Sequence, residues 1–333
     1  MIKKIKYVFA ITVLLLAGAS VSYSGDIYHV KIFGNNDIHF TPDNPARYDT
    51  ENVIANDNGR VITRLKSLPE FKAPVKIMAN IKIHPITKDP LSVHDKWDRA
   101  GNIRLAVDGM PDIEIIKFVT AYGGYTEYSV DVSHLAPLLS GERTFKAFID
   151  TWVSPAWKIN FQLSYWLYDL SNPDLIIPLM FTESFNAQDV SKDGILVDVE
   201  IPENVTSVKM HYLVSGHCTD GRDADEFISK YNVISVDGIV VYRYKPWRDD
   251  CKQFRAINPY TKRWSDGNWS SDYSRSGWCP GDIVEPLELD LSDHLTPGKH
   301  TVKFVIEDIR PKDENDHFGY WRVSSYLLGW KNR

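Results

Sequence analysis

Hydrophobic and polar residues alternate along much of this chain, as they do in β-strands that bury one face and expose the other. The pattern is clearest in six segments: 75–83, 102–107, 158–168, 195–201, 207–214 and 301–309. Pairs of turn-forming residues separate such segments, for example Asp108-Gly109 and Asp237-Gly238. No segment shows a long helical period, so we predict an all-β protein.

One unit of the sequence occurs twice. The stretch VDVSHLAPLLSGERTFKAFID at 130–150 is similar to LDLSDHLTPGKHTVKFVIE at 289–307. Each reads as a strand, a short turn with His and Leu, a loop that ends in glycine, and a second strand. A repeated unit of this kind favours two similar β-sandwich domains, joined near 169–178, where Asn-Pro interrupts the pattern. The alternative is a chance similarity between two hairpins.

The N-terminus has the features of a secretory signal peptide. Three lysines precede a short apolar run at 7–17, and small residues follow as far as Gly25. The apolar run is too short to span a bilayer comfortably. We therefore assign residues 1–24 to a signal peptide and predict an exported protein, periplasmic or secreted, without a membrane anchor.

Composition narrows the choice of partners. The net charge is −6 and the chain has no basic run, which argues against nucleic acid, because phosphate binding requires clustered positive charge. Aromatic residues make up 12%, with ten tryptophans, a content that suits either sugar-stacking surfaces or a large sandwich core. The three cysteines permit one disulfide in an oxidising compartment and leave one thiol, but the count does not choose the pair.

The stretch HDKWDRAGNIRLAV at 94–107 combines residue types that suit a sugar-binding catalytic site. Asp95 and Asp98 flank Trp97, and Arg99 follows immediately. A carboxylate can deprotonate or orient a reacting group, an indole can stack on a sugar, and a guanidinium donates several hydrogen bonds. The same residues also suit a loop that is closed by an ion pair and has Trp97 in the core.

Two other regions carry candidate polar groups. In TFKAFIDTW, alternation places Asp150 and Trp152 on one face of a predicted strand, where the acid either faces a site or lies on the rim of a sandwich. In SGHCTDGRDADEFISKYN, acidic residues crowd a loop that also contains His217: Asp220, Asp223, Asp225 and Glu226. Such carboxylates either bind calcium, although the spacing matches no EF-hand, or form a solvated acidic surface.

Several motifs connect these regions to a known family. They are WDRAGNI, KFVTAYGG followed by VDVSHLAPLLSG, FIDTW, and GNW followed by RSGWCPG. Their order and approximate spacing resemble those of the bacterial peptide N-glycosidase F family, from about residue 70 to the C-terminus. The resemblance implies two jelly-roll-like β-sandwich domains packed side by side, at 71–172 and 173–333, with the active site between them. It gives no role to residues 25–70.

The resemblance also implies an activity. Members of that family are amidases that hydrolyse the bond between asparagine and the innermost N-acetylglucosamine of an N-linked glycan. They leave aspartate in the peptide and release a glycosylamine. The expected partners are therefore N-glycosylated peptides or proteins, recognised at the chitobiose core, and no metal or other cofactor is implied.

Individual residues match the family's functional positions. The resemblance gives Asp98 the role of general base, and gives Glu226 and Asp150 the role of positioning water and sugar. It places four more side chains in the chitobiose site: Arg99, Trp152, Arg275 and His217. It also implies a disulfide between Cys251 and Cys279.

The chain departs from the family around this site. The family brackets its second catalytic acid with two cysteines, whereas Asp225 and Phe227 adjoin Glu226 here, and residue 150 is aspartate where the family has glutamate. Two other functions therefore stay open. One is a weak or inactive relative that binds the chitobiose core; the other is a glycosidase, which would also use two carboxylates on a sugar. The amidase is the function we predict.

Overall fold

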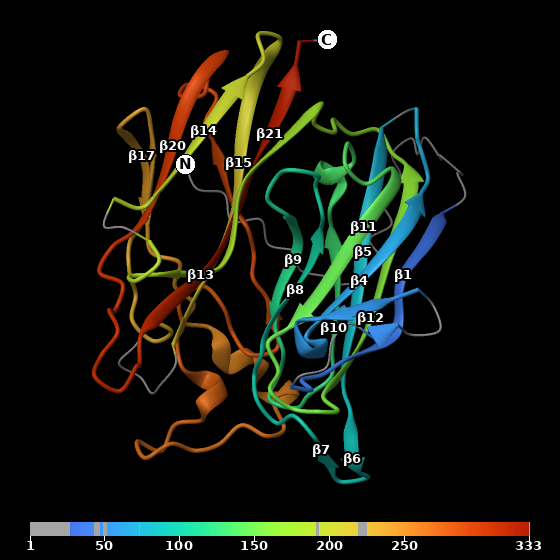
Figure 1. Cartoon of the computed structure of the whole chain (residues 1–333), viewed down its shortest axis with the longest axis vertical. Helices are drawn as coiled ribbons and strands as arrows, with labels where there is room; N and C mark the ends of the chain where they lie inside the picture. Colours follow the sequence, from blue (N-terminus) through green and yellow to red (C-terminus); the bar gives the residue numbers. More distant parts are fainter. Residues whose placement is uncertain are drawn as a thin grey trace, which may run out of the picture.

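The computed structural model describes residues 27–42, 47–48, 52–72, 74–190, 193–218 and 225–332. It confirms the all-β class, because two β-sandwiches lie side by side, the first coloured mainly blue to green and the second mainly yellow to red (Figure 1). The signal peptide assigned to residues 1–24 falls outside the described residues. Within them, no helix is both long and apolar enough to cross a membrane.

The first sandwich consists of two facing sheets. One has the strand order β1 (Tyr28–Ile38), β12 (Trp157–Leu167), β5 (Val75–Pro85) and β10 (Thr126–Asp131). The other has the order β18 (Asp282–Ile283), β9 (Ile113–Val119), β8 (Ala100–Leu105), β11 (Gly141–Ile149), β4 (Val61–Leu68), β3 (Ile54–Asn56) and β2 (Arg47–Tyr48). Alternate residues of β5, such as Ile77 and Ile81, are buried in one core with Phe145 and Phe161, as the period-two pattern predicts.

The second sandwich repeats this arrangement with its own core. One sheet has the order β13 (Leu175–Asn186), β21 (Gly319–Lys331), β15 (Val205–Cys218) and β19 (Leu287–Asp290). The facing sheet has the order β14 (Ile195–Ile201), β20 (Gly298–Ile306), β16 (Asn232–Val236) and β17 (Ile239–Tyr244). Met210, Phe304 and Trp321 are among the side chains buried between these sheets. Two short 3₁₀ helices, η3 (Cys251–Ile257) and η4 (Ser270–Asp272), lie between β17 and β18 in the chain, and β6 (Thr87–Asp89) and β7 (Ser92–Val93) form a separate hairpin.

The repeated unit of the sequence has the same place in both sandwiches. β10 lies at the edge of its sheet, and the chain passes through η2 (Ser133–Leu135) and Gly141 into β11 of the facing sheet. β19 also lies at a sheet edge, and the chain passes through Gly298 into β20 of the facing sheet. Both glycines have positive φ, 67° and 130°, a conformation that side chains disfavour. The similarity is therefore a structural repeat and not a coincidence between hairpins.

The segment without a predicted role contributes to both sheets of the first sandwich. Within residues 28–68, β1 pairs with β12, and β4 pairs with β11. We therefore propose that the first domain begins near residue 28 rather than at 71, while the boundary at 172 and 173 stays a prediction.

The two sandwiches share a buried polar interface. Every residue of β9 is buried, because the core of its own sandwich lies on one side and β21 of the second sandwich lies on the other. The Lys117 ammonium donates a 2.8 Å hydrogen bond to the Arg322 carbonyl oxygen and lies 3.3 Å from Glu114 Oε2. The same Glu114 oxygen accepts a 2.6 Å hydrogen bond from Ser324. These bonds fix the orientation of one sandwich against the other.

A pair of histidines lies in the same interface. The ring of His134 in η2 lies 4.3 Å, centroid to centroid, from the ring of His211 in β15. Tyr326 Oη lies 2.9 Å from His134 Nε2 and 3.1 Å from His211 Nδ1, and Glu288 Oε2 lies 3.4 Å from His211 Nε2. Burial lowers the pKa of His134 well below its usual value, and the neighbouring His211 adds to this effect. His134 is therefore neutral in the folded protein at neutral pH.

Folding stability should decrease as the pH falls below about 6.5, because the unfolded chain then binds a proton that folded His134 does not bind. The contribution of His134 is complete above its unfolded pKa and is lost progressively as the pH falls from that value through the lower folded pKa. Below about pH 6.5, we expect the unfolding free energy of His134→Gln to decrease less steeply with falling pH than that of the wild type. The difference between the two slopes should be at most about 1.4 kcal/mol per pH unit.

Denaturant unfolding of the wild type and the variant at several pH values measures this slope. His294→Gln, at an exposed position, is the matched control and should leave the slope unchanged. An unchanged slope in His134→Gln would show that His134 is not the titrating group.

Candidate active site

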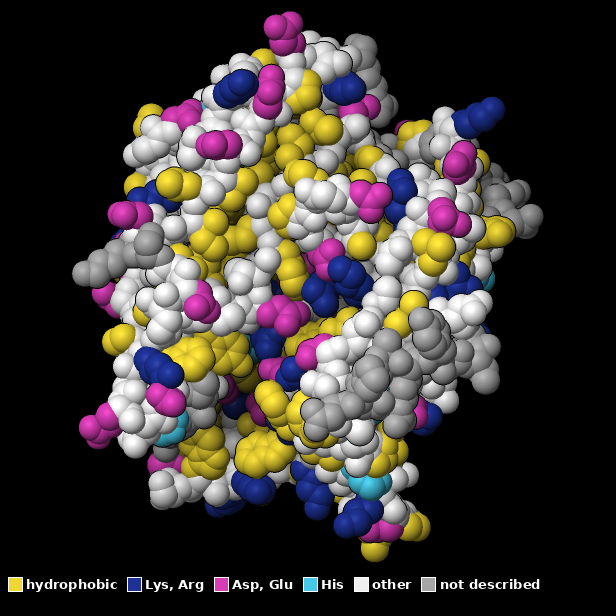
Figure 2. Space-filling model, viewed as in Figure 1, with side chains coloured by type: hydrophobic (Ala, Val, Ile, Leu, Met, Phe, Trp, Pro, Cys, Tyr) yellow, Lys and Arg dark blue, Asp and Glu magenta, His cyan; other side chains and the backbone are white. Residues whose placement is uncertain are grey.

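Side chains from both sandwiches meet where the sandwiches join. The first sandwich supplies Asp98, just before β8, and Tyr122, just after β9; the C-terminal half supplies Glu226, between β15 and β16, and Arg275, just after η4. Figure 2 shows acidic and basic side chains gathered along the middle of the face where the sandwiches meet, with hydrophobic side chains beside them. We call Asp98, Tyr122, Glu226 and Arg275 the arginine–carboxylate cluster.

Arg275 is the centre of this cluster. Its side chain is fully buried, and its Nε donates a 3.0 Å hydrogen bond to Glu226 Oε1 while its Nη2 lies 3.7 Å from Asp98 Oδ2. Two backbone carbonyls, of Ser270 and Tyr273, accept further hydrogen bonds at 2.7 and 3.0 Å. The guanidinium therefore has one fixed orientation, with a carboxylate from each sandwich beside it.

Aromatic rings complete the surroundings of Arg275. The guanidinium carbon lies 5.0 Å from the centroid of Phe227 and 4.8 Å from that of Trp278. Such contacts are favourable because the ring faces carry negative potential. They also exclude water from the ion pairs, which strengthens the electrostatic interactions in the cluster.

Burial changes the protonation of the two carboxyls. Burial raises the pKa of Glu226 to about 7, with Arg275 acting in the opposite direction and Asp98 adding to the rise. Burial also raises the pKa of Asp98, whereas Arg275 and a hydrogen bond with Tyr122 act to lower it. Burial raises the pKa of the Tyr122 hydroxyl well above its usual value, so Tyr122 is protonated and donates to Asp98. Two coupled carboxyls of this kind can hold or release a proton near neutral pH, as a general acid and base must.

One oxygen of Asp98 is available for a further partner. Asp98 Oδ2 is buried and accepts no hydrogen bond from the described residues. It lies beside Arg275 but beyond hydrogen-bonding distance of it. This buried oxygen is thus an acceptor that the described residues leave unsatisfied, and a bound water or substrate proton would satisfy it.

The loop before β8 contains an ion pair of Arg99, but its partner is Asp95 and not the adjacent Asp98. Arg99 donates two hydrogen bonds to the fully buried Asp95, at 2.9 and 3.1 Å. Asp95 also accepts from Thr151 at 2.6 Å. Trp97 is 53% exposed, so the interpretation with this indole in the core is wrong. Asp95 closes the loop, and this leaves Asp98 for Arg275.

Asp150 and Trp152 lie in a neighbouring group of side chains. β11 ends at Ile149, and Asp150 accepts from Arg322 Nη2 at 2.6 Å and from Arg60 Nη1 at 3.2 Å. Trp152 is 58% exposed, with the Arg60 guanidinium 4.6 Å from its ring centroid. The group borders an open cavity of about 260 Å³ lined by Asp57, Arg60, Phe148, Asp150, Glu183, Ser184, Phe318, Tyr320 and Arg322.

Tyr320 connects this cavity to the arginine–carboxylate cluster. Tyr320 lines the cavity and stacks on His217, which in turn stacks on Trp278 beside Arg275. Burial raises the pKa of Tyr320, while Arg322 acts in the opposite direction and Asp150 adds to the rise. His217 stacks between Tyr320 and Trp278, with centroid distances of 5.5 and 5.3 Å. Burial lowers the pKa of His217 well below its usual value, so the ring is a neutral part of the wall.

The acidic loop is not a solvated surface where the structure describes it. Asp225 is fully buried and the side chain of Glu226 is only 16% exposed, because both carboxylates pair with cations of the second sandwich. The interpretation as a solvated loop is therefore wrong for these two residues. Asp220 and Asp223, which the calcium alternative requires, lie outside the described residues.

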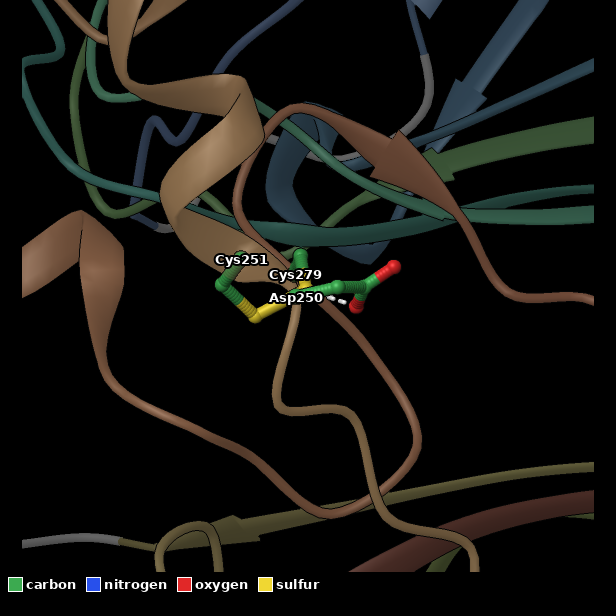
Figure 3. Close-up of side chains that lie close together, drawn as sticks. All are labelled: Asp250, Cys251 and Cys279. Atoms are coloured by element: carbon green, nitrogen blue, oxygen red, sulfur yellow. Dashed lines mark hydrogen bonds between the residues drawn. A yellow bond between two sulfur atoms is a disulfide. The ribbon is translucent and has the colours of Figure 1, made fainter.

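The structure contains the disulfide between Cys251 and Cys279, the pairing that the resemblance implies. Figure 3 shows this bond beside Asp250. Among the described residues, these three side chains form the one group of metal-ligand type that is close enough to hold an ion, but both sulfurs are already bonded to each other. The group is therefore structural. Cys218 lies elsewhere, with its Sγ 3.4 Å from Glu226 Oε2.

Sequence reasoning missed some of the side chains that build these groups. Tyr122 stands inside the quoted motif KFVTAYGG, so a signal for it was present. Arg322 is a charge within the hydrophobic stretch of β21, a signal for a partnered or functional position. Arg60 comes from the N-terminal segment that lacked a predicted role.

Comparisons with known proteins agree with this architecture. Residues 184–328 match the family model described as Peptide-N-glycosidase F, C terminal. The chain is 22% identical to peptide-N(4)-(N-acetyl-beta-D-glucosaminyl)asparagine amidase F of Elizabethkingia miricola, over 98% of this chain and 96% of that protein.

Solved structures show the same fold. PNGF-II superimposes with a TM-score of 0.80 at 25% identity, over 92% of this chain, which spans only 65% of the length of that structure. PNGase F, a glycosylasparaginase from Flavobacterium meningosepticum, superimposes with a TM-score of 0.71 at 19% identity, over 93% of this chain and 97% of that one. Fold and site together define a two-sandwich protein with paired carboxylates at the junction of its sandwiches. The C-terminal part of the chain thus matches the peptide-N-glycosidase F family model, and the chain as a whole has the fold of the solved PNGase F structures.

Replacing both cysteines of the disulfide should destabilise the protein. The bond spans a sequence separation of 28 residues that includes η4 and Arg275, and a loop of this length contributes about 3 kcal/mol on the chain-entropy estimate. We expect Cys251→Ala with Cys279→Ala to lower the free energy of unfolding by about this amount, measured by denaturant titration. Cys218→Ala is the control that leaves the disulfide intact. A double variant as stable as the wild type would contradict the prediction.

Proposed function

We propose that this protein is an amidase that hydrolyses the bond between asparagine and the innermost N-acetylglucosamine of N-linked glycans. The observation that carries the proposal is the arginine–carboxylate cluster, in which Asp98 and Glu226 approach one buried arginine from opposite sides of the junction. An amide carbonyl is a poor electrophile, so its hydrolysis requires an activated water and a proton for the leaving nitrogen. Two coupled carboxyls with raised pKa values suit both requirements.

Each member of the cluster has a role in this proposal. Asp98 binds a water molecule at Oδ2 and removes its proton as the water oxygen bonds to the carbonyl carbon. Glu226, whose pKa is raised to about 7, is partly protonated at neutral pH and provides the proton when the carbon–nitrogen bond breaks. The products are aspartate in the peptide and a glycosylamine. Arg275 stabilises the negative charge that develops between the carboxylates.

The adjoining cavity would hold the glycan. Trp152 has an exposed ring that can stack on a sugar face, and Arg60, Asp150 and Arg322 supply hydrogen-bonding groups around it. Arg99, held by Asp95, supports the loop that carries Asp98. We propose the chitobiose core as the ligand of this region and N-glycosylated peptides as the substrates. The disulfide suits an exported protein, since such bonds persist in oxidising compartments.

One observation favours a weaker function. Asp150 is already engaged by two arginines, at 2.6 and 3.2 Å, which limits its freedom to bind water or sugar directly. A relative that binds the chitobiose core and cleaves it slowly or not at all is therefore the second candidate.

Asp98→Asn should abolish deglycosylation while preserving the fold. The amide keeps the size of the side chain but cannot take a proton from water, and loss of a general base costs about 100- to 10,000-fold in rate. Mass spectrometry of a treated glycopeptide distinguishes the candidate functions. Aspartate at the glycosylated position indicates the amidase, a retained N-acetylglucosamine indicates a glycosidase, and bound but unchanged glycopeptide indicates a binding protein. Near-normal turnover by a folded Asp98→Asn variant would exclude Asp98 as the base.

Asp150→Ala should weaken the use of substrate without removing the chemistry. We expect kcat/KM to fall by about 100-fold, because Arg60 and Arg322 lose the anion that positions them beside the sugar. Asp112→Ala is the matched control: Asp112 is similarly shielded and also pairs with two cations, Arg104 and Lys146. If Asp150→Ala and Asp112→Ala have the same kcat/KM, residue 150 lies outside the substrate site.

A further inference from the structure

Asp225, the residue before Glu226, is the acceptor of a fully buried polar network. Its side chain has no solvent exposure, and its Oδ2 accepts a 2.8 Å hydrogen bond from the indole of Trp321. Its Oδ1 lies 3.0 Å from the Lys230 ammonium and 3.3 Å from the backbone nitrogen of Arg310. Lys230 also donates to the Asp308 carbonyl oxygen. One carboxylate thus connects the loop of Glu226 to β21 and to the segment that precedes it.

The two strands that pack against Asp225 have glycines at the points of contact. A Cβ added at Gly319 in β21 would lie 2.3 Å from Asp225 Cγ, and a Cβ at Gly216 in β15 would lie 2.8 Å from the Asp225 carbonyl oxygen. Neither distance is sterically possible without movement of the backbone or of Asp225. Neighbouring strands therefore provide the space for this residue, and they confine its carboxylate closely.

Glu226, the residue after Asp225, is held by a different segment of the chain. The backbone nitrogen of Ser276 donates a 2.9 Å hydrogen bond to the Glu226 carbonyl oxygen, and Ser276 Oγ donates to the Ile228 carbonyl oxygen at 3.1 Å. Ser276 directly follows Arg275, whose Nε donates to Glu226. Asp225 holds the loop against β21, and the segment 275–276 holds it against the cluster.

A buried carboxylate of this kind is costly to the fold unless it is paired, and an apolar residue would often be as stable in its place. Asp225 instead contributes to the geometry of the site. Displacement of a catalytic group by about 1 Å can lower the reaction rate on the order of 100-fold. We propose that Asp225 is a positioning residue for Glu226: it fixes the loop so that the Glu226 carboxylate meets Arg275. This inference rests on the amidase proposed above for its kinetic test, and it has a second test that does not.

The kinetic test uses Asp225→Ala, with Lys230→Gln as a milder variant should the first fail to fold. We expect kcat to fall by about 10- to 100-fold in folded Asp225→Ala, by less in Lys230→Gln, and KM to change little. The limb of the pH–rate profile that belongs to Glu226 should move to higher pH, because Arg275 lowers the pKa of Glu226 and the contact is weakened.

The matched control is Asp313→Asn. Asp313 pairs with the Arg310 side chain at 2.9 Å and accepts from two backbone nitrogens of the same segment, but it does not contact Asp225. Its loss should lower the thermal midpoint and leave kcat and the pH profile unchanged. A purely structural role for Asp225 predicts the same result for both variants, and that result would overturn the proposal.

The second test measures Cys218 instead of turnover. Cys218 Sγ lies 3.4 Å from Glu226 Oε2, and a carboxylate so close disfavours the reactive thiolate. We expect iodoacetamide to alkylate Cys218 several-fold faster in Asp225→Ala than in the wild type, with Glu226→Gln giving the rate without the carboxylate. If the wild type cleaves no glycopeptide but alkylation is faster in Asp225→Ala, the amidase is wrong and the positioning role stands. If the wild type is active and Asp225→Ala keeps wild-type kcat, pH profile and alkylation rate, the positioning role is wrong.

Discussion

The site depends on the buried guanidinium of Arg275. A charge with no solvent exposure must be compensated inside the protein, and Arg275 obtains this from two carboxylates and two backbone carbonyls. Asp98 comes from the first sandwich and Glu226 from the C-terminal half, so neither sandwich alone completes the compensation. The buried charge of Arg275 is therefore compensated only when the two sandwiches are assembled.

The surrounding cations and anions are divided into separate groups. Arg99 pairs with Asp95, Arg60 and Arg322 pair with Asp150, and Lys230 pairs with Asp225. Asp98 lies just before Arg99 in the sequence, yet Arg275 is its closer electrostatic partner and the larger influence on its pKa. Asp95, Asp150 and Asp225 each pair with other cations. Asp98 and Glu226 are therefore the two acids that share Arg275, at the proposed catalytic site.

The interface between the sandwiches provides the rigidity that such a site needs. β18 adds a short piece of the C-terminal half to the sheet of the first sandwich, and the bonds of Lys117 and Glu114 continue this contact within the interior. Buried hydrogen bonds across an interface favour one arrangement over nearby alternatives. Small shifts of one sandwich against the other would separate Asp98 from Glu226, and this network opposes them.

The sequence by itself determined the class of fold and the internal repeat, and it offered most of the polar residues from which the site is proposed. Period-two alternation depends only on which face of a strand is buried, so it is visible in segments such as 75–83 without knowledge of the partners. The resemblance to a known family implied Asp98, Glu226 and Arg275 as site residues, and the structure brings these three side chains together. The tertiary structure decided which acid meets which cation, because distant side chains approach one another only after strands have paired, and even adjacent residues such as Asp98 and Arg99 have different partners. It assigned Asp95 to Arg99, buried Asp225 beneath β21, and brought Arg60 from the N-terminal segment to Asp150. Charge pairing depends on three-dimensional distance and burial, and neither is contained in the order of residues along the chain.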